Sequence, residues 1–146
     1  MNIAIALLYS SLLISIAIID IKSRLILDKI VYPTMAIVLL LAIVNPEIKA
    51  WNSLLGGIIG LGLMLAFVVA TGGNGMGMGD VKLGALIGLM VGFPDIIYVV
   101  AGSWVIGMAL FFLRNKEEHQ MPFAPAMVVA TITTFTITIL AIGVWF

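Results

Sequence analysis

The sequence predicts an all-α integral membrane protein, built as a bundle of about six transmembrane helices. Hydrophobic residues make up 63% of the 146 residues and charged residues only 10%, against roughly a quarter in ordinary soluble domains. Charged and turn-forming residues also divide the chain into six apolar segments. A chain of this length suits one compact bundle, so we expect a single membrane-embedded domain over residues 1–146.

The apolar segments define the predicted helices. They are Ile3–Ile19, Ile30–Val44, Leu54–Ala70, Val81–Val91, Ile96–Leu113 and Phe123–Phe146. Most are long enough to cross a hydrocarbon core of about 30 Å, allowing for local thinning or short extensions. No basic residue precedes the first segment and no small-residue cleavage site follows it. We therefore expect a retained helix there, and not a removed signal peptide.

Small residues predict which helices pack closely. Gly56 and Gly60 mark one face of the third segment, and glycines recur every four residues from Gly84 to Gly92 along the fourth. This spacing lets helix backbones approach each other, because van der Waals packing holds helices together in lipid. The fourth segment is short and has Lys82 in its first turn. We therefore expect a short central helix shielded by its neighbours, with glycines that serve packing and not chemistry.

Two prolines introduce the sixth segment. The stretch reads Met121-Pro122-Phe123-Ala124-Pro125-Ala126. Proline is tolerated in the first turn of a helix, so a helix start is the plain interpretation. Two prolines three residues apart also fix the angle at which the chain enters the helix. The threonines that follow are expected to form hydrogen bonds within the helix or to its neighbours.

Loop charges predict the orientation in the membrane. The first, third and fifth loops carry six basic residues, whereas the second and fourth carry only Lys49. The six are Lys22, Arg24, Lys29, Lys82, Arg114 and Lys116. Basic loops stay in the cytoplasm, so both termini are expected outside. Asp20, which opens the first loop, and Asp80, which closes the third, would then lie on the cytoplasmic side at similar depth.

Composition excludes several kinds of chemistry. The chain contains no cysteine, which excludes disulfides, cysteine-ligated zinc and thiol catalysis. The one histidine, His119, lies in a charged loop and cannot build a histidine metal site alone. A net charge of zero gives a nucleic-acid partner no electrostatic support.

Asp20 and Asp80 are the candidate catalytic residues. A carboxylate at the mouth of a membrane helix is costly and indicates a functional site by default. Two carboxyl groups within hydrogen-bonding distance share one proton. The ionised group can activate a water while the protonated one polarises a peptide carbonyl. The pair predicts an aspartic protease in or beside the bilayer. The alternative, in which each carboxylate caps a helix or pairs with a nearby basic residue, stays open.

A strip of alternating glycines precedes Asp80. Gly75, Gly77 and Gly79 alternate with larger residues there. Because glycine allows close approach of another chain, an extended substrate peptide could lie against this strip; a simple flexible turn is the alternative. Lys82 is expected to extend toward the lipid headgroups or to orient its neighbours, and not to catalyse.

Three stretches resemble the type IV prepilin leader peptidases, which are membrane aspartic proteases with a Gly-x-Gly-Asp motif. The segment Asp20-Ile21-Lys22-Ser23-Arg24-Leu25-Ile26 is similar to the family's first aspartate segment. Gly77-Met78-Gly79-Asp80-Val81-Lys82 matches the second motif through its trailing Val-Lys. Pro122-Phe123-Ala124-Pro125 is similar to a Pro-Phe-x-Pro element near the last helix. The resemblance covers essentially the whole chain as the family's catalytic half. Presenilin-like proteases share only the Gly-x-Gly-Asp part.

The resemblance implies a complete set of functional expectations. Asp20 and Asp80 would be the catalytic pair, without cofactor or metal. Residues expected to position the motif or the substrate are Gly77, Gly79, Lys82, Pro122 and Pro125. The substrates would be precursors of pilin, pseudopilin or flagellin-like subunits, whose short basic leader stays in the cytoplasm ahead of an apolar helix. The enzyme would be a multi-pass protein of the cytoplasmic (inner) membrane. The orientation from loop charges independently puts both carboxylates on that face.

Two departures from the family pattern limit these expectations. Many members carry Pro-Asn shortly after the first aspartate, where this chain reads Leu27-Asp28. Asp28 is therefore a minor rival to Asp20. Longer members also carry a four-cysteine region associated with methylation of the new amino terminus. This sequence has neither the cysteines nor room for that region, so we expect peptidase activity without N-methyltransferase activity.

Two other functions compete with the peptidase. A proton-coupled transporter would use a carboxylate pair as a proton relay. It predicts polar residues at mid-depth and inverted repeats, neither of which is clear here. A non-catalytic membrane component of a pilus or secretion machine would keep the fold without the reaction. Intact aspartates favour the enzyme over this scaffold.

Overall fold

The computed structural model describes residues 3–23, 28–45, 49–70, 72, 77–113 and 123–144, and every regular element among them is an α-helix. The helices are α1 (Ile3–Ser23), α2 (Asp28–Val44), α3 (Ala50–Ala70), α4 (Met78–Val91), α5 (Asp95–Leu113) and α6 (Phe123–Val144). Each coincides with one predicted apolar segment. The predicted all-α class is therefore confirmed.

Several helices extend beyond the predicted segments, as α3 does by beginning at Ala50. Two of these differences concern the candidate catalytic residues. α1 continues to Ser23, so Asp20 lies inside a helix and does not open a loop. α4 begins at Met78, so Asp80 lies in its first turn and does not close a loop. Aspartate, isoleucine and lysine are all tolerated in helices at modest cost. The change from apolar to charged residues thus marks the end of the apolar stretch, and the helical hydrogen bonding extends beyond it.

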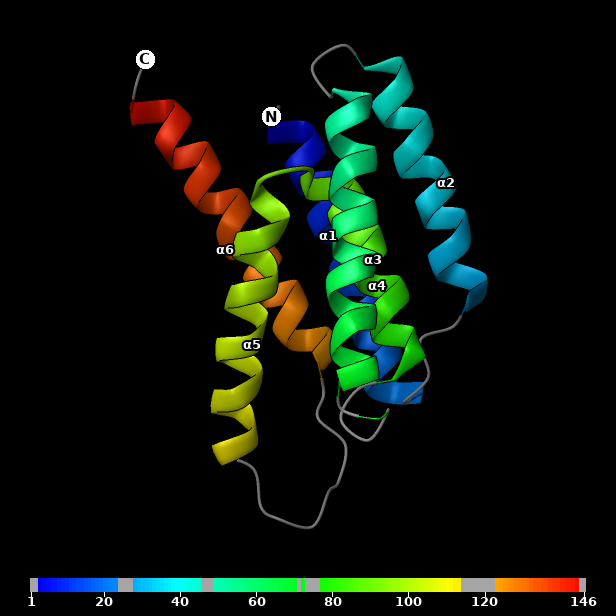
Figure 1. Ribbon diagram of the computed structural model, residues 1–146. Helices are drawn as coiled ribbons and strands as arrows, with labels where there is room; N and C mark the ends of the chain where they lie inside the picture. Colours follow the sequence, from blue (N-terminus) through cyan, green and yellow to red (C-terminus); the bar gives the residue numbers. More distant parts are fainter. Residues whose placement is uncertain are drawn as a thin grey trace.

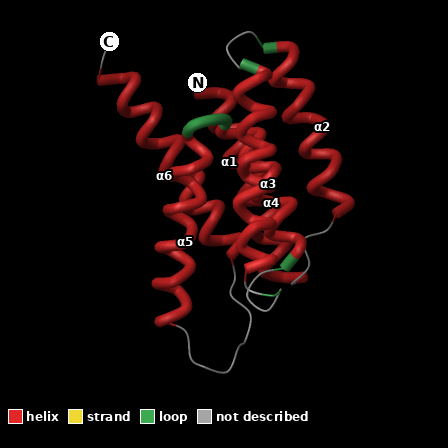
Figure 2. Tube along the Cα trace, viewed as in Figure 1, coloured by secondary structure: helices red, strands yellow, loops and turns green. Residues whose placement is uncertain are grey.

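Successive helices run in alternating directions along the bundle (Figure 1). The end of α1 and the starts of α4 and α6 lie at the lower end in this view, and both chain termini lie toward the upper end. The tube in Figure 2 shows the same arrangement of helices. The two helix ends that carry Asp20 and Asp80 therefore lie at the same end of the bundle.

The short helix α4 lies in the core. Of its 14 residues, those from Val81 to Met90 are buried, with Lys82 the half-buried exception. α4 packs most extensively on α3 and also contacts α2, α5 and α6. Three of its side chains, Leu83, Leu86 and Ile87, have no exposed surface. The expectation of a short central helix shielded by its neighbours is confirmed.

Glycines on both helices bring the α3 and α4 backbones into contact. A Cβ added to Gly88 would overlap the carbonyl of Gly56, and a Cβ added to Gly60 would overlap the carbonyl of Gly84. Gly92 ends α4 with a φ of 77°, a left-handed conformation that favours glycine. The Ser53 hydroxyl donates a hydrogen bond from α3 to the Leu89 carbonyl. The predicted packing role of these glycines is confirmed.

One helix of the described chain, α3, is long and apolar enough to cross a membrane by length and composition. It has 21 residues and a mean hydropathy of 2.3. Shorter apolar stretches occupy four other helices: Ala4–Ile19, Ile30–Val44, Asp95–Ala109 and Pro125–Thr138. The six predicted helices are present, whereas six membrane crossings stay a prediction. Threonines of α6 donate to carbonyls of the preceding turn, as Thr131 does to Met127 at 2.7 Å, which confirms their predicted hydrogen bonding.

Candidate active site

Asp80 lies in the first turn of α4, at one end of the buried core. Its backbone N–H donates to the Gly77 carbonyl at 3.1 Å, which closes the first turn. Gly77 occupies the N-cap position with extended backbone angles (φ −81°, ψ 155°) and provides no side-chain cap. The amino-terminal end of a helix favours negative charge, because its backbone N–H groups point outward there. The half-buried Asp80 carboxylate is therefore placed where the fold itself stabilises it.

Few described atoms lie around Gly77. Among the residues that the structure describes, a Cβ added there would find a single neighbouring atom within 4 Å, the Gly79 nitrogen at 3.9 Å. Its φ of −81° suits any residue. Neither backbone conformation nor packing against the described residues therefore requires glycine at this position, unlike at Gly84 and Gly88.

Lys82 contacts an aromatic ring of a neighbouring helix. Its ammonium nitrogen lies 5.4 Å from the centre of the Tyr32 ring, which belongs to α2. A cation at this distance from a ring is attracted by the negative charge of the ring face. The contact joins α2 to the turn that carries Asp80 and restricts where the Lys82 side chain lies. This geometry favours the predicted orienting role of Lys82.

The start of α6 packs beside the first half of α4. Pro125 is the third residue of α6 and is half-buried, in agreement with a proline in the first helical turn. One turn after Asp80, a Cβ added to Gly84 would lie 3.4 Å from the terminal methyl of Met127, a residue of α6. The start of α6, which contains Pro125, therefore lies near the candidate site. Pro122 lies outside the described residues.

The structure describes the helix in which Asp20 lies and not the Asp20 side chain. Its backbone lies in α1 one turn before Ser23, and its side chain lies outside the described part of the chain. The side chain of Asp28, at the start of α2, lies outside it too. The pairing of Asp20 with Asp80, and the rivalry of Asp28, therefore stay predictions. Among the described residues, no three histidine, cysteine, aspartate or glutamate side chains are grouped as metal ligands.

Tyr32 is the site residue that sequence reasoning missed. It belongs to no motif and lies 50 positions from its partner, so only the packing of α2 on α4 brings it to Lys82. The charge of Lys82 in the first turn of a buried helix was the available signal. A partly buried ammonium needs a partner, and the ring of a neighbouring helix can provide one.

Comparison with known proteins identifies a family. A model of the type IV leader peptidase family matches residues 7–112, a range that includes Asp20 and the motif from Gly77 to Lys82. No solved structure matches the chain.

Three similar proteins are each named prepilin leader peptidase/N-methyltransferase. The Bacillus subtilis protein is 30% identical over 135 residues, which cover 89% of this chain and 54% of that protein. The Aeromonas hydrophila protein is 29% identical over 134 residues, covering 86% and 46% respectively. The Dichelobacter nodosus protein is 27% identical over 140 residues, covering 92% and 49%. The chain spans about half the length of the curated relatives it matches. Since the family match extends over most of its residues, this chain belongs to the type IV leader peptidase family.

Proposed function

We propose that this protein is a membrane aspartic endopeptidase that removes the short basic leader from prepilin-like precursors. The observation that carries the proposal is the placement of Asp80. It stands at the start of a buried central helix, after an N-cap glycine that packing against the described residues does not require, inside the range matched by the family. The end of α1 that carries Asp20 lies at the same end of the bundle.

The proposed reaction uses Asp20 and Asp80 as a pair that shares one proton. The ionised carboxylate takes a proton from water as the water oxygen attacks the peptide carbonyl carbon. The protonated carboxyl donates to the carbonyl oxygen, which gives a tetrahedral intermediate. The carbon–nitrogen bond then breaks as the nitrogen takes a proton from the pair and a hydroxyl of the intermediate returns its proton to the pair, so that one shared proton remains. No metal or cofactor takes part in this scheme.

The open strip before Asp80 supports an extended substrate. A peptide in a helix has its carbonyl groups engaged in hydrogen bonds, so the bond to be cut must lie in extended chain. The space beside Gly77 lets a substrate backbone approach the first turn of α4. Lys82, held near Tyr32, would position the substrate or Asp80. Precursors of pilin, pseudopilin or flagellin-like subunits fit, because they carry a leader directly ahead of an apolar helix.

Outward-facing apolar side chains support the proposed membrane location. Large hydrophobic residues are exposed on most helices, among them Leu7 (66%), Ile43 (71%), Ile58 (66%), Val105 (70%) and Ile137 (66%). Extensive exposed apolar surface indicates contact with a membrane or partner. The bias of basic residues toward the first, third and fifth loops supports a cytoplasmic site. The proposal covers hydrolysis only, since these 146 residues hold no cysteine for the methylation region of longer members.

The test is cleavage of a co-expressed prepilin-like precursor from the same organism. Wild type should give a leader-sized shift on a gel, and Asp20→Asn and Asp80→Asn should each slow cleavage by about 100-fold or more, the usual range for a lost general acid or base. Glu117→Gln, in the charged stretch at 116–119, is the matched control and should cleave normally. Recovery of each variant from the membrane fraction, still able to bind precursor, shows that folding is retained.

The same experiment separates the alternatives. Cleavage by the Asp20 variant and not by an Asp28→Asn variant would make Asp28 the partner of Asp80. Normal cleavage by Asp80→Asn would overturn the proposed mechanism. A folded wild-type protein that cuts no precursor would favour the non-catalytic assembly component.

A further inference from the structure

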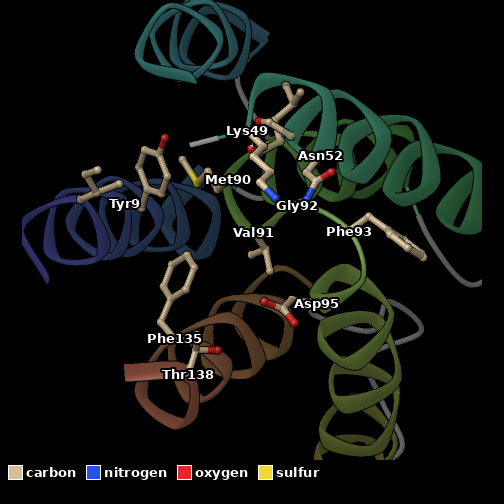
Figure 3. Close-up of a pocket in the computed structure, with 13 residues that line it drawn as sticks. Tyr9, Lys49, Asn52, Met90, Val91, Gly92, Phe93, Asp95, Phe135 and Thr138 are labelled. Atoms are coloured by element: carbon tan, nitrogen blue, oxygen red, sulfur yellow. Dashed lines mark hydrogen bonds between the residues drawn. The ribbon is translucent and has the colours of Figure 1, made fainter. Parts of the chain in front are cut away.

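A cavity of about 310 Å³ lies at the end of α4 that is remote from Asp80. Five helices and the turn after α4 contribute to its lining, and the charged or polar members include Lys49, Asn52, Asp95 and Thr138. Figure 3 shows these side chains around the carboxyl end of α4, with Tyr9 and Phe135 on the side of α1 and α6. The cavity shares no lining residue with the candidate active site.

Two opposite charges line this cavity without neutralising each other. Lys49 is exposed just before α3, and Asp95 is the half-buried first residue of α5. Both lie in the described chain, and no ion pair joins them there. In the view of Figure 3 the Lys49 ammonium and the Asp95 carboxylate lie on either side of Val91. The site therefore offers separate attraction to an anionic and a cationic group.

Two further polar features of the cavity need partners. The Tyr9 hydroxyl is buried, with 1% of the residue exposed, and has no hydrogen-bond partner among the residues the structure describes. The carboxyl end of α4 is also the negative end of the helix dipole, which favours a cation. Together with Asp95 it makes one side of the cavity suited to an ammonium group. Lys49 and the Asn52 amide suit an acceptor such as a phosphate.

We propose that this cavity binds a zwitterionic headgroup that carries a phosphate and a primary ammonium, as phosphatidylethanolamine does. A phosphate alone would meet the Asp95 carboxylate, and a simple amine would meet Lys49, so a group with both charges fits best. Ile5, Leu89 and Phe135 provide apolar lining for the start of an acyl chain. The lipid assignment rests on the proposed function in one respect, the membrane location, and the chemistry of recognition does not depend on peptidase activity.

The test measures lipid retained by the purified full chain. Protein in detergent is mixed with equal amounts of phosphatidylethanolamine and phosphatidylglycerol of matched acyl chains, and bound lipid is counted by native mass spectrometry. Wild type should prefer phosphatidylethanolamine. Lys49→Met and Asp95→Asn should each weaken its binding about tenfold, as expected for loss of one charge-assisted hydrogen bond. Lys49→Arg keeps the charge and should retain the preference.

Each outcome bears on the proposal. Equal retention of the two lipids by wild type would overturn it. An unchanged lipid preference in both Lys49→Met and Asp95→Asn would also overturn it, because the two charges would then only stabilise helix ends. Competition with free phosphoethanolamine identifies the source of the headgroup: displacement assigns the soluble compound, and no displacement assigns the lipid. Repeating the measurement with Asp80→Asn separates the two proposals, because lipid preference should persist when cleavage is lost.

Discussion

At the start of α4 a methyl group added to Gly77 would meet almost nothing among the described residues, whereas one added to Gly88, three turns further along, would overlap the α3 backbone. The same residue type thus serves two purposes in one helix. Gly84 and Gly88 let two backbones of the same chain come into contact, and in the proposed function Gly77 leaves room beside Asp80 for a second molecule. Glycine in this helix is therefore a packing residue at one end and a candidate functional residue at the other.

The largest effect expected from this comparison is loss of stability in Gly88→Ala. The new Cβ would overlap the Gly56 carbonyl, and backbone cannot move aside as a side chain can. We expect destabilisation by about 2–3 kcal/mol, at the upper end of the range for overpacking. Unfolding of detergent-solubilised protein in a titration with sodium dodecyl sulfate measures it. Gly62→Ala, in α3 with no atom within 4 Å of its added Cβ, is the matched control and should be as stable as wild type or slightly more so.

An intermediate effect is expected at the other end of the helix. Gly77→Ala should leave the unfolding free energy within about 0.5 kcal/mol of wild type, as for an open surface position. Precursor cleavage should fall about tenfold in kcat/KM, the usual penalty of a misfitting methyl group in a binding site. If stability fell and cleavage of the folded fraction did not, Gly77 would be a packing glycine like Gly88.

The smallest effect concerns the contact between Tyr32 and Lys82. Tyr32→Leu removes the ring and should lower kcat/KM by about two- to fivefold, the equivalent of one exposed cation–π contact. Tyr32→Phe keeps the ring and should cleave as wild type does. In a double-mutant cycle with Lys82→Met, the two losses should be less than additive, because both changes remove the same contact. Strict additivity would mean that Tyr32 does not act through Lys82.

Local patterns in the sequence were enough to predict the helices and the glycine faces along which helices pack closely. Apolar runs predicted all six helices, and the four-residue spacing of glycines indicated close packing by α3 and by α4; the structure shows that these two faces meet each other. The helix ends at Asp20 and Asp80 were misplaced, because a charge ends an apolar run without ending a helix. The Tyr32–Lys82 contact and the cavity between Lys49 and Asp95 depend on how distant helices pack, and no local pattern encodes them. The pairing of Asp20 with Asp80 stays a prediction from the motifs.

The alignment of α3 against α4 also has a consequence for the depth of the proposed reaction. Gly56 faces Gly88 and Gly60 faces Gly84, so each four residues forward in α3 correspond to four residues back in α4. One further step of four residues places Met64 level with Asp80. α3 continues for six residues beyond that level, to Ala70, which is about 9 Å at 1.5 Å per residue. If α3 spans the bilayer from one surface to the other, Asp80 lies about 9 Å below the membrane surface at which α3 ends. Water and an unwound stretch of substrate must both enter the membrane before any bond is broken, so the ease of unwinding would decide which precursors are cut.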